Sequence, residues 1–297
     1  MPSEGCPRSV LRQPFGHATY PRDLPRIESQ SDAPVVRFIL LGLAAAFVGK
    51  RSLRTTRRCQ PDGRSASQGD VGVILLSAGV GKRMGANIPK QYVKLLGKEI
   101  ALRSLDVFLK CGDVGEIVIV CSNEWRSVFS DYVGSGVRPT IKYAEGGAER
   151  QDSVKNGLRQ IRSEYVAVHD SARPLVTVAE VEKVVADAHE YGAALLAVPT
   201  KATIKQSQVE NGKHFVAHTP DRNTMWEAHT PQVFRTELLR RGFKHAQEHD
   251  FLVTDDASLT EHLCHSVKLT EGEYTNIKAT TPEDINVAEA VLRSRAC

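Results

Sequence analysis

Residues 76–92 combine a glycine-rich turn with several cations. The turn reads Leu76-Ser77-Ala78-Gly79-Val80-Gly81-Lys82-Arg83-Met84-Gly85, and Pro89-Lys90-Gln91-Tyr92 closes it. It follows the apolar run 71–76, whose β-branched residues are typical of a buried strand. Backbone N–H groups in such a turn can face an anion while Lys82, Arg83 and Lys90 neutralise its charge. The segment therefore predicts a phosphate-binding loop at the carboxyl end of a strand.

Three kinds of phosphate loop share this composition, and their spacing separates them. An ATPase P-loop has a glycine five positions before its Gly-Lys pair and a Ser or Thr after it, but Leu76 and Arg83 stand there. A dinucleotide-binding loop requires a third glycine where this chain has Met84. A nucleotidyltransferase loop remains, in which Arg83 and Lys90 would stabilise charge at the reacting phosphate. The alternative is a tight strand-to-helix turn with solvated cations.

Two further clusters follow predicted strands, at the end where open parallel sheets bind ligands. Residues 146–153 open a predicted helix, and their glycines and the Ser153 hydroxyl could face a base or a ribose; a simple helix capped by Asp152 is the alternative. In 169–174, Asp170 ends a buried strand and could bind a sugar hydroxyl or a metal. Arg173 could hold that carboxylate by an ion pair, or the two could form a purely structural pair.

Two weaker clusters lie later in the chain. Arg222 stands on the return leg of a predicted hairpin and is suited to a bidentate grip on phosphate, with Thr203 on the outgoing leg. Lys278 ends an extended segment, and Thr254 could cap a helix or reach a ligand. A solvated turn arginine is the alternative for Arg222, and a single lysine is weak evidence for a site.

The remaining sequence predicts the elements that position these residues. Strand-like and helix-like segments alternate after residue 70, which indicates one α/β domain with a mostly parallel sheet and helices on both faces. We predict strands at 71–76, 116–120, 140–143, 165–168, 193–198 and 267–269, and helices at 100–109, 125–132, 152–161, 178–191, 237–248, 256–264 and 283–292. Residues 199–224 interrupt the alternation with a β-hairpin, legs 203–205 and 214–217, around Asn211-Gly212. A second subunit would cover its exposed edges.

The first 69 residues differ in composition from the rest. They hold 11 Lys and Arg against 5 Asp and Glu, a net charge of +6, whereas the whole chain carries +4, so residues 70–297 carry −2. The body therefore has no net positive charge to attract nucleic acid or a membrane surface. Residues 1–34 are typical of disorder, and the apolar run 38–48 is too short to span a bilayer.

An apolar run followed by a basic, Ser- and Thr-rich stretch at 50–67 is typical of a two-step plastid leader. A single-step transit peptide and a retained membrane anchor are the alternatives. The six cysteines have neither zinc-ligand nor disulfide-framework spacing, and we expect them to be thiols in a reducing compartment. We therefore predict a targeting leader at 1–69 and a single domain at 70–297.

Taken in order, these motifs resemble the 2-C-methyl-D-erythritol 4-phosphate cytidylyltransferase family. The resemblance covers about residues 71–293, and its most specific parts are 78–84 with 89–92, 169–174, 221–223 with 230–232, 254–258 and 276–278. It implies a Rossmann-like sheet of the nucleotide-diphospho-sugar transferase type and a homodimer joined through the β-arm 199–224. It also implies transfer of CMP from CTP to methylerythritol phosphate, with release of pyrophosphate and with Mg²⁺ bound mainly through the CTP phosphates. From the leader, we expect this reaction to take place in the plastid stroma.

The resemblance further implies a role for each matching residue. CTP would contact Ser77, Ala78, Gly79, Gly147, Ala148 and Ser153. Arg83 and Lys90 would stabilise the transition state, while Arg222 and Lys278 would position the methylerythritol phosphate. Asp170, Arg173, Thr203 and Thr254 would contact the acceptor, with Thr203 and Arg222 supplied by the second subunit.

The chemistry of such a transfer agrees with a site rich in cations. The acceptor phosphate is already ionised and is itself the nucleophile, so the reaction needs positioning and charge stabilisation rather than a general base. Two alternatives stay open at this point: a sister cytidylyltransferase that acts on ribitol 5-phosphate, and a non-catalytic nucleotide-binding protein.

Overall fold

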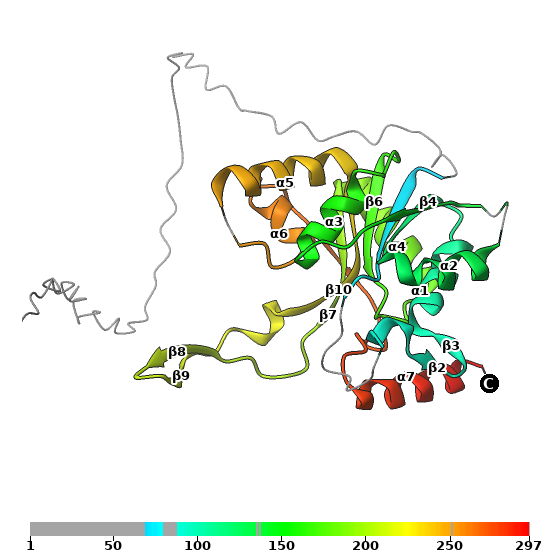
Figure 1. Ribbon diagram of the computed structural model, residues 1–297. Coiled ribbons are helices and arrows are strands. Elements are labelled where there is room, and N and C mark those ends of the chain that lie inside the picture. Colours follow the sequence, from blue (N-terminus) through cyan, green and yellow to red (C-terminus); the bar gives the residue numbers. More distant parts are fainter. Residues whose placement is uncertain (1–68, 80–87, 135, 137, 251, 297) are drawn as a thin grey trace, which may run out of the picture. The chain divides into compact units, whose positions relative to one another are not determined.

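A seven-stranded sheet in the order β11-β7-β10-β6-β1-β4-β5 forms the centre of the fold. Figure 1 shows the computed structural model, which describes residues 69–79, 88–134, 136, 138–250 and 252–296. The leader up to residue 68 and the middle of the glycine loop, with Arg83, lie outside the described residues. The strands are β1 (Val71–Leu76), β4 (Val114–Val120), β5 (Thr140–Ala144), β6 (Tyr165–Asp170), β7 (Ala193–Pro199), β10 (Trp226–Arg235) and β11 (Lys268–Glu271).

Helices cover both faces of the sheet because neighbouring residues of its central strands are apolar on opposite sides. Leu75 of β1 belongs to one core with Phe108 and Val184, whereas Ile74 belongs to the other core with Leu158 and Phe243. The helices are α1 (Ile100–Lys110), α2 (Arg126–Val133), α3 (Arg150–Leu158), α4 (Val178–Tyr191), α5 (Thr236–His249), α6 (Asp256–Glu261) and α7 (Pro282–Arg295). Among the described helices, none is both long and apolar enough to cross a bilayer.

The predicted alternation is confirmed for the seven-stranded sheet, apart from one of its strands that the sequence analysis missed. Strand β10 lies between β6 and β7 and runs antiparallel to both, with Val233 opposite Ala167 and Ala194. Its polar residues and Pro231 hide a strand pattern, and its pairing with β7 is irregular between Ala228 and Gln232. The other six strands run in one direction, as predicted.

Several boundaries also differ from the prediction. Helix α3 begins at Arg150 rather than at residue 152, because Glu149 is the N-cap and Asp152 bonds back to it from the third helical position. Helix α6 ends at Glu261, three residues before the predicted end. The short strands β2 (Lys94–Leu95) and β3 (Lys98–Glu99) form a small hairpin that was not predicted, and one-turn helices η2 (Lys90–Tyr92), η3 (Asn123–Trp125) and η4 (Arg222–Thr224) complete the described elements.

The inserted hairpin consists of β8 (Gln206–Glu210) and β9 (Lys213–His218). Asn211 and Gly212 join them with φ angles of 49° and 73°, the left-handed pair that a type I′ turn requires. The first leg begins at Gln206, so the predicted strand at 203–205 was wrong and these residues form a connection instead. Figure 1 shows the hairpin projecting away from the sheet, and each residue of both strands is exposed.

Candidate active site

A cavity of about 380 Å³ opens at the carboxyl ends of β1 and β6, beside the first turn of α3. Segments far apart in the sequence meet there because the parallel strands all deliver their carboxyl ends to this edge of the sheet. Most of the predicted site residues line it: Ala78, Gly79, Lys90, Gly147, Ala148, Ser153, Asp170 and Lys278. Gln91, Glu149, Arg150, Ser171 and Thr280 also line it, and the sequence analysis had given them no role.

The loop after β1 is fixed by the motif that closes it. The Gln91 side-chain amide donates to the carbonyls of Ser77 and Gly79, at 2.7 and 2.8 Å. The Tyr92 hydroxyl donates to the same Ser77 carbonyl at 2.9 Å. Ser77 itself is buried and does not line the cavity, and its hydroxyl has no hydrogen-bond partner in the described structure.

The loop before α3 packs so closely against the β1 loop at Gly146, and against its own helix at Gly147, that only glycine fits at either position. A Cβ atom on Gly146 would lie 2.5 Å from the Cβ of Ala78, and one on Gly147 would lie 2.2 Å from the Cβ of Asp152. The Gly147 N–H donates to the Ser153 hydroxyl at 3.0 Å, and that hydroxyl donates to the Glu149 carbonyl. Backbone atoms of both loops therefore form the wall of the cavity, as expected for a site that holds phosphates and a base.

A chain of ion pairs crosses the floor of the cavity. Asp170 uses one carboxylate oxygen for the Arg150 Nε, at 3.1 Å, and the other for the Lys278 Nζ, at 2.6 Å. Arg150 also reaches Asp256 at 2.8 Å. The chain joins β6, α3, α6 and the segment before α7, so it fixes the position of the Lys278 ammonium.

These contacts keep Asp170 and Arg150 charged. Burial disfavours the charge on Asp170, but Arg150 and Lys278 outweigh it and hold the pKa of the carboxyl well below its ordinary value. Burial likewise disfavours the charge on Arg150, but Asp256 and Asp170 outweigh it and raise the pKa of the guanidinium. Asp170 is therefore an ionised acceptor near neutral pH and not an acid or a base.

The predicted ion pair between Asp170 and Arg173 is wrong. The buried Arg173 guanidinium donates instead to the carbonyls of Asn276, at 2.6 Å, and Ala228, at 3.4 Å. The side-chain amide of Asn276 in turn donates to the Thr230 carbonyl at 3.0 Å. Arg173 thus attaches the segment that carries Lys278 to β10, and its predicted contact with the acceptor stays a prediction.

The remaining predicted residues lie apart from the cavity. Thr203 and Arg222 are exposed on the arm, and Thr254 is exposed before α6, whose N-cap is Asp255. None of the three lines the cavity of the described chain. The sequence analysis assigned no role to Arg150 or Gln91, although both lie in motifs that it had singled out.

A mostly parallel α/β sheet whose carboxyl edge holds two glycine-containing loops and two lysines, Lys90 and Lys278, is the arrangement expected of a nucleotidyltransferase. Comparison of the sequence with known families gives a narrower assignment. Residues 71–294 match the family model described as IspD, 2-C-methyl-D-erythritol 4-phosphate cytidylyltransferase, and the chain belongs to this family. Membership of this family does not favour either alternative, the ribitol 5-phosphate cytidylyltransferase or a non-catalytic nucleotide-binding protein.

Curated relatives and solved structures agree with the match. The 2-C-methyl-D-erythritol 4-phosphate cytidylyltransferase of rice, named chloroplastic, is 50% identical over 235 residues, covering 78% of this chain and 78% of the rice protein. The enzyme of that name from Alkaliphilus metalliredigens is 42% identical over 229 residues, covering 76% of this chain and 94% of the relative. The structure of 4-diphosphocytidyl-2C-methyl-D-erythritol synthase from Anaerococcus prevotii has a TM-score of 0.66 at 28% identity, covering 75% of this chain and 98% of that one.

Proposed function

We propose that this chain transfers CMP from CTP to 2-C-methyl-D-erythritol 4-phosphate, giving 4-CDP-2-C-methyl-D-erythritol and pyrophosphate. The observation that carries the proposal is the convergence of Lys90, Lys278 and the backbone of residues 78–79 and 147–148 on one cavity. Backbone N–H groups suit the triphosphate, and the two ammonium groups suit a reaction that brings two anions together. The names of the relatives supply the identity of the acceptor.

In this reaction a phosphate oxygen of the acceptor attacks the α-phosphorus of CTP, and the bond from that phosphorus to the pyrophosphate breaks. Arg83 and Lys90 stabilise the charge on the transferred group, while Lys278 and Arg222 hold the acceptor phosphate in line. Asp170 fixes Lys278 and is itself fixed by Arg150. His169, beside Asp170, has no exposed surface, and burial lowers its pKa to about 3, so it does not serve as a base.

Mg²⁺ bound through the CTP phosphates fits the donors of the cavity. The carboxylates that line the cavity are those of Asp170 and Glu149, and both oxygens of Asp170 are already paired with cations. The described lining thus offers one or two carboxylates, a donor set typical of Mg²⁺ sites that are completed by substrate phosphates. When bound, the ion would neutralise charge on the triphosphate.

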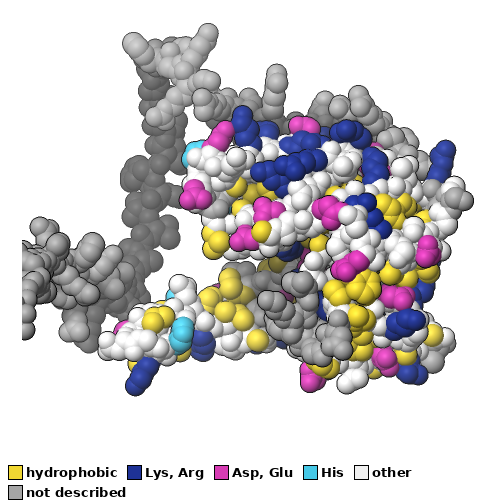
Figure 2. All heavy atoms as spheres, in the orientation of Figure 1, with side chains coloured by type: hydrophobic (Ala, Val, Ile, Leu, Met, Phe, Trp, Pro, Cys, Tyr) yellow, Lys and Arg dark blue, Asp and Glu magenta, His cyan; other side chains and the backbone are white. Residues whose placement is uncertain are grey.

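The arm supports a homodimer in which each site is completed by the other chain. Val209, Phe215 and Val216 are 64%, 48% and 60% exposed on β8 and β9, and Figure 2 shows hydrophobic side chains uncovered on the arm. A two-stranded hairpin is marginally stable in water unless something packs on it. Pairing with a second copy would cover these side chains and bring Thr203 and Arg222 to the partner's cavity.

The leader and the chloroplastic name of the rice relative support a plastid location. A fluorescent protein placed after residues 1–69 should accumulate in plastids of a photosynthetic host, and the same fusion without those residues should not. Cytosolic fluorescence from both fusions would contradict the proposal.

The decisive experiment measures pyrophosphate released by residues 70–297 with CTP and Mg²⁺, comparing methylerythritol phosphate with ribitol 5-phosphate. We expect release with methylerythritol phosphate and little with ribitol phosphate. Preference for ribitol phosphate would reassign the acceptor. Absence of release with either acceptor, from protein whose circular dichroism shows it folded, would overturn the catalytic proposal.

A further inference from the structure

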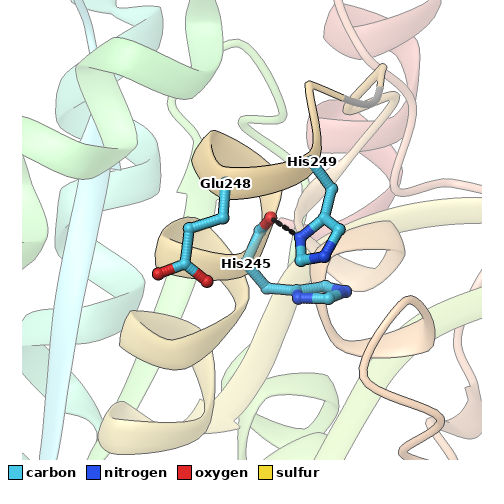
Figure 3. A group of neighbouring side chains, drawn as sticks. All are labelled: His245, Glu248 and His249. Carbon is cyan, nitrogen blue, oxygen red and sulfur yellow. Dashed lines mark hydrogen bonds between the residues drawn. The ribbon is translucent and has the colours of Figure 1, made fainter.

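The last turn of α5 places three side chains with metal-binding atoms near one another. His245, Glu248 and His249 each offer one such atom, and these atoms lie within 4.8 Å of one another. Figure 3 shows the two imidazole rings side by side, and their centroids are 4.1 Å apart. The spacing explains this arrangement, because residues three and four positions apart share one face of a helix.

A hydrogen bond orients one of the rings for metal binding. The His249 Nδ1 lies 3.0 Å from the backbone carbonyl oxygen of His245, drawn as the dashed line in Figure 3. Since a carbonyl oxygen can only accept, Nδ1 carries the proton, and in the neutral ring the lone pair is then on Nε2. Histidines that bind metals usually donate their second ring nitrogen in this way, which fixes the tautomer.

We propose that His245, Glu248 and His249 bind a transition-metal dication of the Zn²⁺ class. Two imidazoles and one carboxylate are typical protein ligands of zinc, with bonds of about 2.0–2.2 Å. Glu248 and His249 are exposed and His245 is half-buried, so small side-chain rotations can draw the ligand atoms together from their present spacing. The carbonyl end of a helix also carries partial negative charge, which favours a cation there.

One neighbouring cation competes for the carboxylate. The Lys244 Nζ lies 3.8 Å from a carboxylate oxygen of Glu248, but both side chains are largely exposed. Exposed pairs of this kind contribute little to stability, so the ion can displace the lysine. A bound ion would crosslink the last turn of α5 and stabilise the folded chain. This proposal does not depend on cytidylyl transfer.

Calorimetric titration with ZnCl₂ tests the proposal on the untagged full chain, stripped with chelator, with its thiols alkylated and without nucleotide. We expect the wild type to bind one zinc ion through this site, and His245→Asn and His249→Asn each to weaken that binding by about tenfold or more, since even outer-shell changes at metal sites reach that size. His214→Asn, which removes an exposed histidine from β9, is the matched control and should bind like the wild type.

Thermal unfolding supplies the second readout. Zinc should raise the Tm of the wild type and of His214→Asn but not that of His249→Asn, while the metal-free Tm values should agree. Should His249→Asn fail to fold, Glu248→Gln carries the test through weaker binding in a folded chain. Equal affinity in the wild type and in folded His245→Asn and His249→Asn variants would overturn the proposal, as would an equal loss in His214→Asn.

Discussion

Asp170 is a positioning residue at the floor of the cavity. Its side chain is only 11% exposed, and its two oxygens face Arg150 and Lys278. Removing its charge would leave Arg150 with Asp256 alone and would release Lys278. The residue therefore contributes to stability and also to the placement of the cation that we assign to the acceptor phosphate.

Asp170→Asn should lower the free energy of unfolding at neutral pH by about 3 kcal/mol, because it breaks a largely buried pair while leaving the cations in place. The pKa of Asp170 is lowered by folding from an ordinary value of 3.8. A carboxylate with a lowered pKa in the folded state stabilises fully above the unfolded pKa and loses this contribution as pH falls toward the folded pKa. The difference between wild type and variant should thus be constant from pH 8 to about 5 and shrink below about pH 4.

Urea unfolding at several pH values measures this difference. Glu164→Gln is the matched control, since Glu164 pairs with Arg235 on the surface with both side chains about half exposed. It should change stability by about 1 kcal/mol or less at neutral pH. A difference for Asp170→Asn that stays constant or grows below pH 4 would contradict the proposed charge state.

The sequence identified the cavity residues better than their contacts. Asp170 was found because it ends a buried strand, and Lys278 because it stands in a recognisable motif. Arg150 was missed as the partner of Asp170 because Arg173 is nearer in the chain, whereas the actual partner is 20 residues away. The acceptors of Arg173 are backbone carbonyls, whose positions depend on the fold and leave no trace in residue types.

At the scale of the elements, two loops beside the cavity contact each other. The loop before α3 touches the β1 loop through Gly146 and Ala78, and both loops contribute residues to the cavity that we assign to the nucleotide. Any side chain at Gly146 must push the loops apart.

Gly146→Ala should destabilise the fold by about 1–3 kcal/mol, because its methyl group would lie 2.5 Å from the Cβ of Ala78. Separation of the loops should also raise the KM for CTP more than the KM for the acceptor. Urea unfolding and steady-state pyrophosphate release measure the two effects.

Gly112→Ala is the matched control for this substitution. A Cβ at Gly112 would meet nothing within 4 Å, and no left-handed φ is required there. Alanine should therefore leave stability unchanged or raise it by about 0.4–1 kcal/mol, by restricting the unfolded chain. Similar stability and similar KM values for CTP in both variants would show that the loop contact is unimportant.

Elements with a strong local sequence pattern could be predicted, whereas strand β10, which lacks such a pattern, could not. Helix α4 was predicted with its observed bounds, and the structure shows why these are sharp: Thr177 and Glu180 form a capping box, and Gly192 ends the helix with a φ of 84°. Strand β10 has its apolar residues interrupted by Glu227, His229 and Thr230, and it becomes a strand only because β6 and β7 supply partners on both sides. Tertiary pairing outweighed local preference there.

At the scale of the whole molecule, the proposed dimer predicts complementation between inactive variants. Lys90→Ala and Arg222→Ala chains should each be inactive, but after subunit exchange a heterodimer would hold one intact site, because Lys90 of one chain would meet Arg222 of the other. Random exchange should restore about a quarter of the wild-type activity. Pyrophosphate release before and after mixing measures the recovery.

A mixture of Lys90→Ala and Lys278→Ala chains is the matched control. Both lysines line the cavity of the same chain, so every site in that mixture keeps a defect and activity should stay low. Recovery in neither mixture, with subunit exchange demonstrated separately, would argue that Arg222 serves no site of a second copy.

The arm leaves and rejoins the sheet at a single point. Pro199 of β7 lies opposite Trp226 of β10, so residues 200–225 connect two neighbouring antiparallel strands. In polymer terms the arm is a closed loop, and doubling the length of a flexible loop costs only about 0.6 kcal/mol of closure entropy. Insertions and deletions in the arm can therefore accumulate with little effect on the stability of the sheet. The reach of the arm is free to change over evolution while the cavity that it would complete stays the same.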